Sequence, residues 1–358
     1  MIDFLVIGGG IAGVSVGARL SHLGHVLLLE GETALGYHAS GRSAAMFEET
    51  YGLPSTVALN RASRSYHNEA NGGVLSPRGL MLLGTADTDD LFAHDLVSME
   101  MDEIDPDAAR QMVPILSDIV IRVGHHADAW DIDTDRLIQN FAREIRDAGG
   151  EVRTSQSVSA IRRDEHGWIV TAGGTEFATR NIVNAGGAWA DRIAGMAGVA
   201  PIGLQPFRRS MARIPAPGGH DVNHWPMIFG AGETWYAKPD AGALLVSPAD
   251  EEPMEPMDAW ADDMVLAEGL ARYQDHVTEE VTRMIANWAG LRTFAPDRNL
   301  VLGPDPDEPR FIWCAGQGGY GFQTSPAASQ LVADLVAGRQ PELSPDVVAM
   351  LSPSRFRP

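Results

Sequence analysis

The chain opens with two short apolar runs on either side of one longer segment of helical composition. Residues 4–7 are apolar and too short for a helix, residues 11–23 have the length and composition of a helix, and residues 25–29 form a second apolar run. A strand, a helix and a second strand in this order form a βαβ unit with parallel strands. The first 29 residues therefore predict the start of an α/β domain.

The middle of the chain has a different pattern. Residues 54–71 and 258–275 predict helices, residues 78–83 predict a strand, and residues 235–246 predict a hairpin with its turn at residues 239–242. Alternation of strands and helices returns between and after these stretches. There we expect strands at 151–154, 180–183 and 311–315, a meander at 158–177 and a helix at 322–337.

This alternation divides the chain into two expected domains, as its 358 residues also suggest. The cofactor domain is expected to comprise residues 1–45, 135–200 and 290–345. Residues 46–134 and 201–289 would form a sheet-rich substrate-binding cap, and residues 346–358 a C-terminal extension. The Pro- and Ser-containing tail from about residue 338 predicts an irregular surface segment.

Composition narrows the class of protein. Hydrophobic residues make up 44% of the chain, and no apolar run approaches the ~18 residues of a membrane span. Residues 2–7 read directly as a core strand, so we expect no signal peptide. The single cysteine, Cys314, allows no internal disulfide, which favours the cytoplasm. The net charge of −21 predicts a solvated acidic surface and argues against nucleic acid and anionic membranes as partners.

A glycine motif joins the first strand to the first helix. Gly8, Gly10 and Gly13 fit G-x-G-x-x-G, with Ile11 and Ala12 between the last two. Gly8 permits the tight turn, Gly10 lets the backbone approach a pyrophosphate, and Gly13 lets the helix pack on the strand. The positive end of the helix then faces the phosphates. The motif predicts a dinucleotide site but does not separate FAD from NAD.

Three further features belong to this site. Glu30 ends the second strand, where a carboxylate can bind a ribose hydroxyl or simply lie at the surface. A small-residue turn with Ala185, Gly186 and Trp189 follows a later strand. A second glycine turn follows the 311–315 strand, and its N–H groups could face a flavin ring, although both turns could also be structural. That turn contains Gly318, Gly319, Tyr320, Gly321, Phe322 and Gln323.

Together with residues 36–45, 131–135, 203–210, 236–242 and 288–292, these stretches resemble the D-amino acid oxidase superfamily, most closely its bacterial D-arginine dehydrogenases. The resemblance implies non-covalently bound FAD and an α/β fold. That fold has a Rossmann-type, glutathione-reductase-like FAD-binding domain and a sheet-rich α+β cap. It also implies that a loop containing Gly41, Arg42, Ser43 and Ala44 lies against the flavin.

The resemblance further assigns substrate contacts. Arg292 would bind the substrate carboxylate, with Tyr236 as its hydroxyl partner, and bidentate guanidinium–carboxylate geometry agrees. Arg209 would lie near the substrate, and the Gly319 carbonyl would orient its amino group. Tyr51 would belong to a loop that closes the entrance. Without the resemblance, Arg292 and Tyr236 would more simply be an ion-paired arginine and a packing tyrosine.

One position departs from the pattern of D-arginine dehydrogenases. Leu80 stands where those enzymes have a glutamate that binds the basic side chain. A leucine cannot pair with a guanidinium, so a neutral or apolar substrate side chain is favoured. Glu48, in the expected entrance loop, could partly substitute, but as a loop acid it is expected to be exposed and solvated.

The expected reaction is therefore FAD-dependent oxidation of a D-amino acid to the imino acid, which water converts to a 2-oxo acid and ammonia. The electron acceptor would be oxygen, a quinone or an electron-transfer protein. Two alternatives remain: a glycine, sarcosine or N-methyl amino acid oxidase of the same fold, and a non-catalytic flavin-binding subunit. His125 and His126 lack a further ligand at metal spacing, so no metal site is expected.

Overall fold

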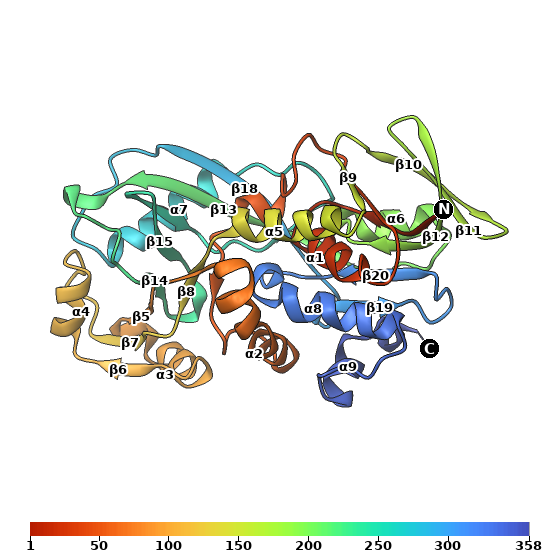
Figure 1. Ribbon diagram of the computed structural model, residues 1–358. Helices are drawn as coiled ribbons and strands as arrows, with labels where there is room; N and C mark the ends of the chain where they lie inside the picture. The colour runs from red at the N-terminus through yellow and green to blue at the C-terminus, as the bar shows by residue number, and fades with distance from the viewer. Residues whose placement is uncertain (358) are drawn as a thin grey trace.

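The computed structural model describes residues 1–357 and shows an elongated molecule with one large sheet at each end (Figure 1). Within these residues the sheet near the two termini has eight strands. Its central strands β9, β2, β1, β12 and β20 are parallel neighbours. The strands are β1 (Ile2–Ile7), β2 (Val26–Leu29), β9 (Glu151–Arg153), β10 (Val158–Asp164), β11 (Gly167–Ala172), β12 (Thr175–Asn184), β19 (Val301–Pro304) and β20 (Phe311–Ala315).

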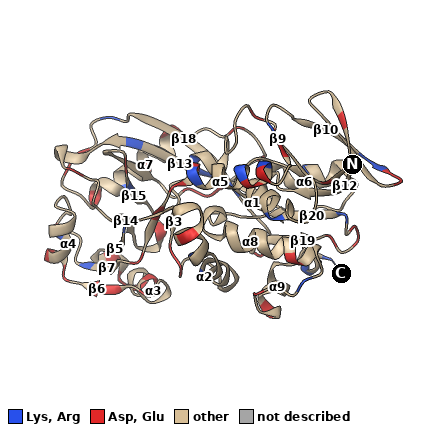
Figure 2. Ribbon diagram, viewed as in Figure 1, with Lys and Arg blue, Asp and Glu red and all other residues tan. Residues whose placement is uncertain are grey.

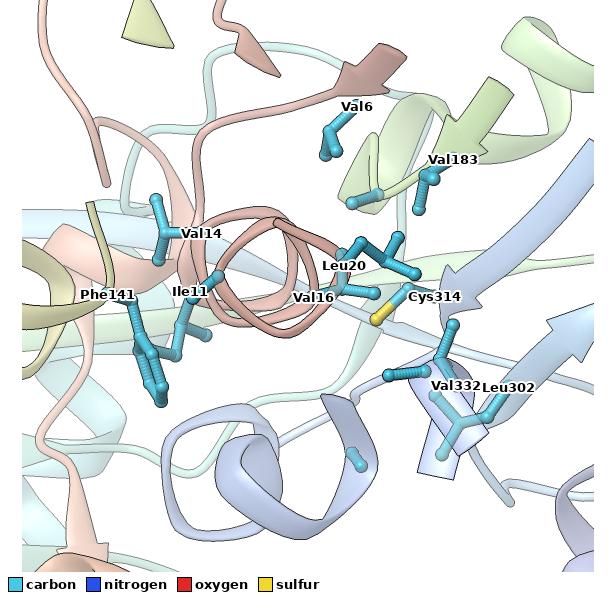
Figure 3. Packing of buried hydrophobic residues seen from close by; sticks show 14 of the residues in the cluster. Val6, Ile11, Val14, Val16, Leu20, Phe141, Val183, Leu302, Cys314 and Val332 are labelled. Carbon is cyan, nitrogen blue, oxygen red and sulfur yellow. The ribbon is translucent and has the colours of Figure 1, made fainter. Parts of the chain in front are cut away.

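Helices cover one face of this sheet and bury its core. α1 (Ile11–Leu20) packs between α5 (Thr134–Asp147) and α8 (Gly321–Val336). Figure 3 shows Val14 and Val16 of α1 among side chains of α5, α8 and β20, and Cys314 points into the same cluster. The apolar run of β1 is buried on both faces, as a central parallel strand must be. α6 (Ala190–Met196) and the β10–β12 meander cover the other face.

The second sheet is mixed and has nine strands within the described residues. Their order is β17-β13-β16-β15-β14-β5-β7-β6, with β18 on the other edge of β13. They are β5 (Leu80–Gly84), β6 (Asp102–Ile104), β7 (Arg122–His126), β13 (Gln205–Pro215), β14 (Met227–Gly230), β15 (Tyr236–Asp240), β16 (Ala243–Ser247), β17 (Glu252–Pro253) and β18 (Ala286–Phe294). Helices α3 (Asp89–Ser98), α4 (Pro106–Met112) and α7 (Asp263–Asp275) lie on this half (Figure 1).

Smaller elements connect the two halves. A short sheet joins β3 (Met46–Phe47), β8 (Trp130–Ile132) and β4 (Leu75–Pro77), and α2 (Pro54–Glu69) packs on α8. The expected fold class, an FAD-type α/β unit with a sheet-rich cap, is confirmed. We propose that the two sheets also mark the two domains. The expected boundary at residue 290 falls inside β18, so this strand belongs wholly to the cap sheet.

Two expectations about helices are wrong. The chain after residue 338 is not irregular: it forms α9 (Pro345–Leu351) and a 3₁₀ turn (Pro353–Phe356), because Leu351 is an apolar residue that can be fully buried under the first sheet. The helix expected from residue 258 begins at residue 263, because the Asp262 carboxylate accepts hydrogen bonds from the Met264 and Val265 amides and caps the helix there.

The surface is acidic over both halves, as Figure 2 shows for α3, β6 and α9. No helix in residues 1–357 is both long enough and apolar enough to cross a membrane. Over the same residues, no three His, Cys, Asp or Glu side chains come together in a way that could hold a metal ion.

Candidate active site

A cavity of about 460 Å³ runs from the carboxyl ends of β1 and β2 to the cap strands β13, β15 and β18. Ligands bind α/β sheets at this edge. Most residues expected at the cofactor line it: Gly8, Gly10, Ile11, Ala12, Glu30, Arg42, Ser43, Ala44, Ala185, Gly186, Trp189, Gly318, Gly319, Gly321 and Phe322. The lining also contains the expected substrate residues Arg209, Tyr236 and Arg292.

The glycine motif has steric reasons in the structure. Gly8 has a φ of 109°, and a Cβ there would lie 2.3 Å from the Ala185 carbonyl oxygen. A Cβ on Gly13 would lie 1.9 Å from the Gly8 carbonyl oxygen, so this glycine allows α1 to pack against the turn. Gly10 leaves the cavity side of the turn open at the N-terminus of α1. This arrangement fits a pyrophosphate.

Glu30 lies at the mouth of the same turn. Its two carboxylate oxygens accept hydrogen bonds from the Gly9 amide, at 2.6 Å, and from the Glu32 amide, at 2.8 Å. These two contacts hold the carboxylate at the end of β2, beside the cavity. An oxygen so placed can still accept a hydroxyl hydrogen, which fits the ribose of a dinucleotide.

The loop expected at the flavin is tied to the cap. Arg42 donates to the carbonyls of Ala289, at 2.8 Å, and Ala259, at 3.0 Å. The buried Lys238 ammonium donates to the Ala44 carbonyl at 2.8 Å and pairs with Asp131 at 2.8 Å. The loop thus has a fixed position between the two halves. Gly41 lies outside the lining, and its amide donates to the Gly36 carbonyl within the loop.

The residues expected at the turn before α8 fall into two groups, those that line the cavity and those that do not. Gly318, Gly319, Gly321 and Phe322 line the cavity, but Tyr320 and Gln323 do not. Tyr320 packs on Tyr51, with ring centroids 5.4 Å apart. Gln323 is buried, and its side-chain oxygen accepts the Glu48 amide at 3.3 Å. These two residues support the entrance side of the cavity.

Two arginines come together at the cap end. β13 and β18 are antiparallel, with Arg209 opposite Gly290 and Phe207 opposite Arg292, so the two arginines lie diagonally on one face. Gly319 lies directly against the Arg292 guanidinium, since a Cβ there would be 2.9 Å from Nη1. Arg209 of β13, Tyr236 of β15, Arg292 of β18 and the backbone of Gly319 therefore line the same end of the cavity.

This cluster carries an excess of positive charge. Burial and the charge of Arg292 lower the pKa of Arg209. Burial alone would lower the pKa of Arg292, but its acidic neighbours, Tyr236 foremost, together raise it. Two close guanidiniums repel each other, and an anion between them removes that repulsion. The cap end of the cavity is therefore suited to a carboxylate.

Tyr51 stands at the edge of this cluster without lining the cavity. Its hydroxyl donates to the Glu233 carboxylate at 2.9 Å, and burial followed by the Glu233 charge raises the pKa of that hydroxyl. Glu233 is exposed and has a φ of 53°, a costly conformation for a side-chain-bearing residue. Glu233 could not be identified from the sequence, because a glutamate after a glycine in a loop has no periodicity.

Leu80 belongs to a buried apolar cluster beside the cavity. Tyr236, Phe229 and Met211 are in the same cluster, and Tyr51 packs against it. The expectation that Glu48 is exposed and solvated is wrong. Its side chain is buried, because Thr50 donates two hydrogen bonds to its carboxylate and His126 lies 3.0 Å from the other oxygen.

The cavity lining also includes three residues after β9 that were not expected from the sequence, Gln156, Ser157 and Val158. β9 is parallel to β2, so its carboxyl end meets the same edge of the sheet as Glu30. The rule that ligands bind at this edge could have identified them.

Comparison with known proteins identifies the family. The model of the FAD dependent oxidoreductase (DAO) family matches residues 3–335.

The chain belongs to this family.

Glycine oxidase of Geobacillus kaustophilus is 24% identical over 94% of this chain and 93% of its own. N-methyl-L-tryptophan oxidase of Salmonella typhimurium is 24% identical over 95% of each chain. Among solved structures, that glycine oxidase superposes with a TM-score of 0.82 over 96% of each chain, at 24% identity. L-proline dehydrogenase from P. horikoshii superposes with a TM-score of 0.83 over 99% of this chain and 97% of that one, at 21% identity.

The family makes this chain an FAD-dependent oxidoreductase, so the expected cofactor is confirmed, and a non-catalytic role is not supported. The glycine motif, Glu30 and the helix N-terminus described above fit that cofactor. These relatives do not single out D-arginine dehydrogenases, so that closer likeness stays a prediction.

Proposed function

We propose that this oxidoreductase oxidises the Cα–N bond of a D-amino acid with a neutral or apolar side chain. The observation that carries the proposal is Arg292. Its guanidinium lines the cavity beside Arg209. Neighbouring tyrosines and Glu233 raise the pKa of this guanidinium, but no group among residues 1–357 accepts a hydrogen bond from it. A charged group left without a partner is costly, so it favours an anionic ligand.

The surrounding residues would orient the rest of the substrate. With the carboxylate on Arg292 and Tyr236, the carbonyl of Gly319, which lies against the Arg292 guanidinium, would accept a hydrogen from the amino group. The side chain would then extend toward the apolar cluster of Leu80, where each Å² buried contributes about 25 cal/mol. Leu80 lies opposite His126 in the cap sheet, and the nearby Glu48 carboxylate is already paired with that histidine, which disfavours arginine and lysine side chains.

FAD bound at the glycine motif would accept the hydride that leaves the substrate α-carbon. The amine must give up a proton as the imino acid forms, and water then releases ammonia and the 2-oxo acid. Oxygen, a quinone or an electron-transfer protein would take the two electrons in a later step. A cytoplasmic location stays a prediction from the single cysteine.

A second candidate is oxidation of glycine, sarcosine or another N-methyl amino acid. The names of two relatives, glycine oxidase and N-methyl-L-tryptophan oxidase, support it. The arginine pair would bind the carboxylate of these substrates equally well. These substrates differ from the D-amino acids of the first candidate in the side chain and in the substituent on nitrogen.

An anaerobic screen separates the candidates. The purified FAD-loaded enzyme is mixed with D-amino acids, L-amino acids, glycine, sarcosine and N-methyl amino acids, and flavin absorbance is followed. We expect neutral D-amino acids to bleach the flavin fastest. Faster bleaching by glycine or sarcosine would select the second candidate. If no amine bleaches a flavin that dithionite does reduce, both candidates fail.

A further inference from the structure

A buried acid lies at the base of the loop that carries Tyr51. Residues 48–51, here called the entrance loop, begin at Glu48, whose side chain is only 5% exposed. One carboxylate oxygen accepts the Thr50 amide at 3.1 Å and the Thr50 hydroxyl at 2.9 Å. The other oxygen lies 3.0 Å from Nδ1 of His126, on β7. Thus the carboxylate joins the loop to the cap sheet.

Inside the turn, the remaining contacts of the loop involve backbone and neutral groups. The Tyr51 amide donates to the Glu48 carbonyl at 3.3 Å, which closes the turn. The Asn60 side chain donates to the carbonyls of Glu48 and Tyr51, and the Thr50 hydroxyl also contacts the Met99 carbonyl. The Glu48 carboxylate is therefore the charged group inside the turn, three positions before Tyr51.

Other charged groups near the loop are engaged elsewhere. On α2, Arg61 and Arg64 pair with Glu49, which faces outward from the loop. Beyond β7, His125 lies on the opposite face of the strand from His126 and feels the charge of Asp102 on β6. The remaining charged contacts are Arg61 with Glu100 after α3, and Tyr51 with Glu233 at the tip of the loop. α8 contributes the neutral Gln323.

Glu48 and His126 compensate each other. Neither the Glu48 Oε2 atom nor the His126 Nδ1 atom makes a hydrogen bond to any other group in residues 1–357. Burial raises the pKa of the Glu48 carboxyl, while the Thr50 hydrogen bond and the His126 charge act in the opposite direction. If either partner is neutralised, the other becomes a buried charge without compensation, which is strongly unfavourable.

We infer that Glu48 and His126 are positioning residues whose ion pair holds the entrance loop in the arrangement that presents Tyr51 to the active site. The part played by Tyr51 at the substrate rests on the proposed function, but the ordering of the loop does not. A charged carboxylate strengthens the two Thr50 hydrogen bonds, because charge-assisted hydrogen bonds are stronger than neutral ones. The loop therefore loosens when the pair loses its charges.

Hydrogen–deuterium exchange of the FAD-loaded full chain tests this inference without any substrate. Protection factors of a peptide covering residues 46–53 are measured at one fixed pH in the native protein and in each variant. The variants are Glu48→Gln, which keeps the shape but removes the charge, and His126→Gln. His125→Gln is the matched control, a neighbouring histidine on the other face of β7.

We expect Glu48→Gln and His126→Gln each to lower the protection by about tenfold, the value of one charge-assisted hydrogen bond. His125→Gln should match the native protein. Equal protection in Glu48→Gln and the native protein, or the same loss of protection in His125→Gln as in His126→Gln, would overturn the inference.

Steady-state kinetics provide a second readout once a substrate is known. Glu48→Gln should raise KM with little change in kcat, because the loop contributes to binding. If exchange behaves as expected but no amine reduces the flavin, the proposed function fails and the inference stands. If the substrate is found but Glu48→Gln does not affect exchange, the inference fails and the proposed function stands.

Discussion

The two ends of the cavity are built in different ways. At the nucleotide end, the shape depends on backbone: Gly8 and Gly13 leave no room for side chains, and Gly10 leaves the cavity open at the N-terminus of α1. At the cap end, the chemistry depends on side chains: Arg209 and Arg292 come from two strands and Tyr236 from a third. The first end needs a short local motif, whereas the second needs the whole fold to bring distant residues together.

This difference separates cofactor binding from turnover. Changes in the glycine turn should remove FAD and destabilise the fold. Changes among the cap side chains should leave FAD bound while turnover or substrate choice changes. Each prediction below tests one side of that separation.

The largest effect is expected for Gly13→Ala. The new Cβ would lie 1.9 Å from the Gly8 carbonyl oxygen, a backbone atom that cannot move without opening the turn. We expect loss of bound FAD, with all activity, and a free energy of unfolding lower by about 1–3 kcal/mol. Flavin absorbance and thermal melting measure the two effects. The control is Gly195→Ala in α6, where a Cβ meets nothing within 4 Å; equal FAD content in both variants would refute the steric account.

Arg292→Ala tests the cap end. Removing one partner of a buried charge pair costs about 2–5 kcal/mol, which corresponds to a decrease in kcat/KM of at least about thirtyfold. FAD content should stay native, since Arg292 lies on β18 of the cap sheet. Arg213→Ala, a neighbouring β13 arginine that pairs with Asp240, is the control and should keep native kcat/KM. Near-native kcat/KM in Arg292→Ala would remove this residue from the site.

A smaller change, in preference rather than in rate, is expected for Leu80→Glu. A carboxylate in the apolar cluster beside Tyr236 would favour a cationic substrate side chain. The ratio of kcat/KM for D-arginine over D-leucine should rise by about tenfold or more, equivalent to about 1.4 kcal/mol. Leu80→Gln separates charge from polarity and should leave the ratio nearly unchanged. The same rise in both variants would mean that Leu80 does not face the substrate side chain.

The smallest expected effect concerns Cys314, for which we expect no covalent bond to the flavin. Burial raises the pKa of the Cys314 thiol to about 12, so it is neutral at physiological pH and points into the core rather than into the cavity (Figure 3). It cannot attach to a flavin there. Acid precipitation should release all yellow colour into the supernatant, and colour left in the pellet would show a covalent bond.

The sequence predicts the nucleotide end of the cavity better than the cap end. The strand, glycine turn and helix around Gly8 are set by neighbours in sequence, so both the fold and the nucleotide end could be predicted. Only the family resemblance predicted that Arg209, Tyr236 and Arg292 lie close together, because no local sequence pattern shows that three strands are neighbours. The burial of Glu48 could not be predicted, since it depends on His126, 78 positions away on another strand. The helix at residues 345–351 likewise depends on burial of Leu351 under a distant sheet.

The most direct test of the account compares two substrates on the native enzyme. Bound FAD is reduced anaerobically by D-leucine and by D-arginine at equal concentrations, and the rates of flavin bleaching are measured. The account predicts that D-leucine reduces the flavin faster, because the apolar cluster around Leu80 buries its side chain and the nearby Glu48 carboxylate is already paired with His126. Faster reduction by D-arginine, by about tenfold or more, would contradict it.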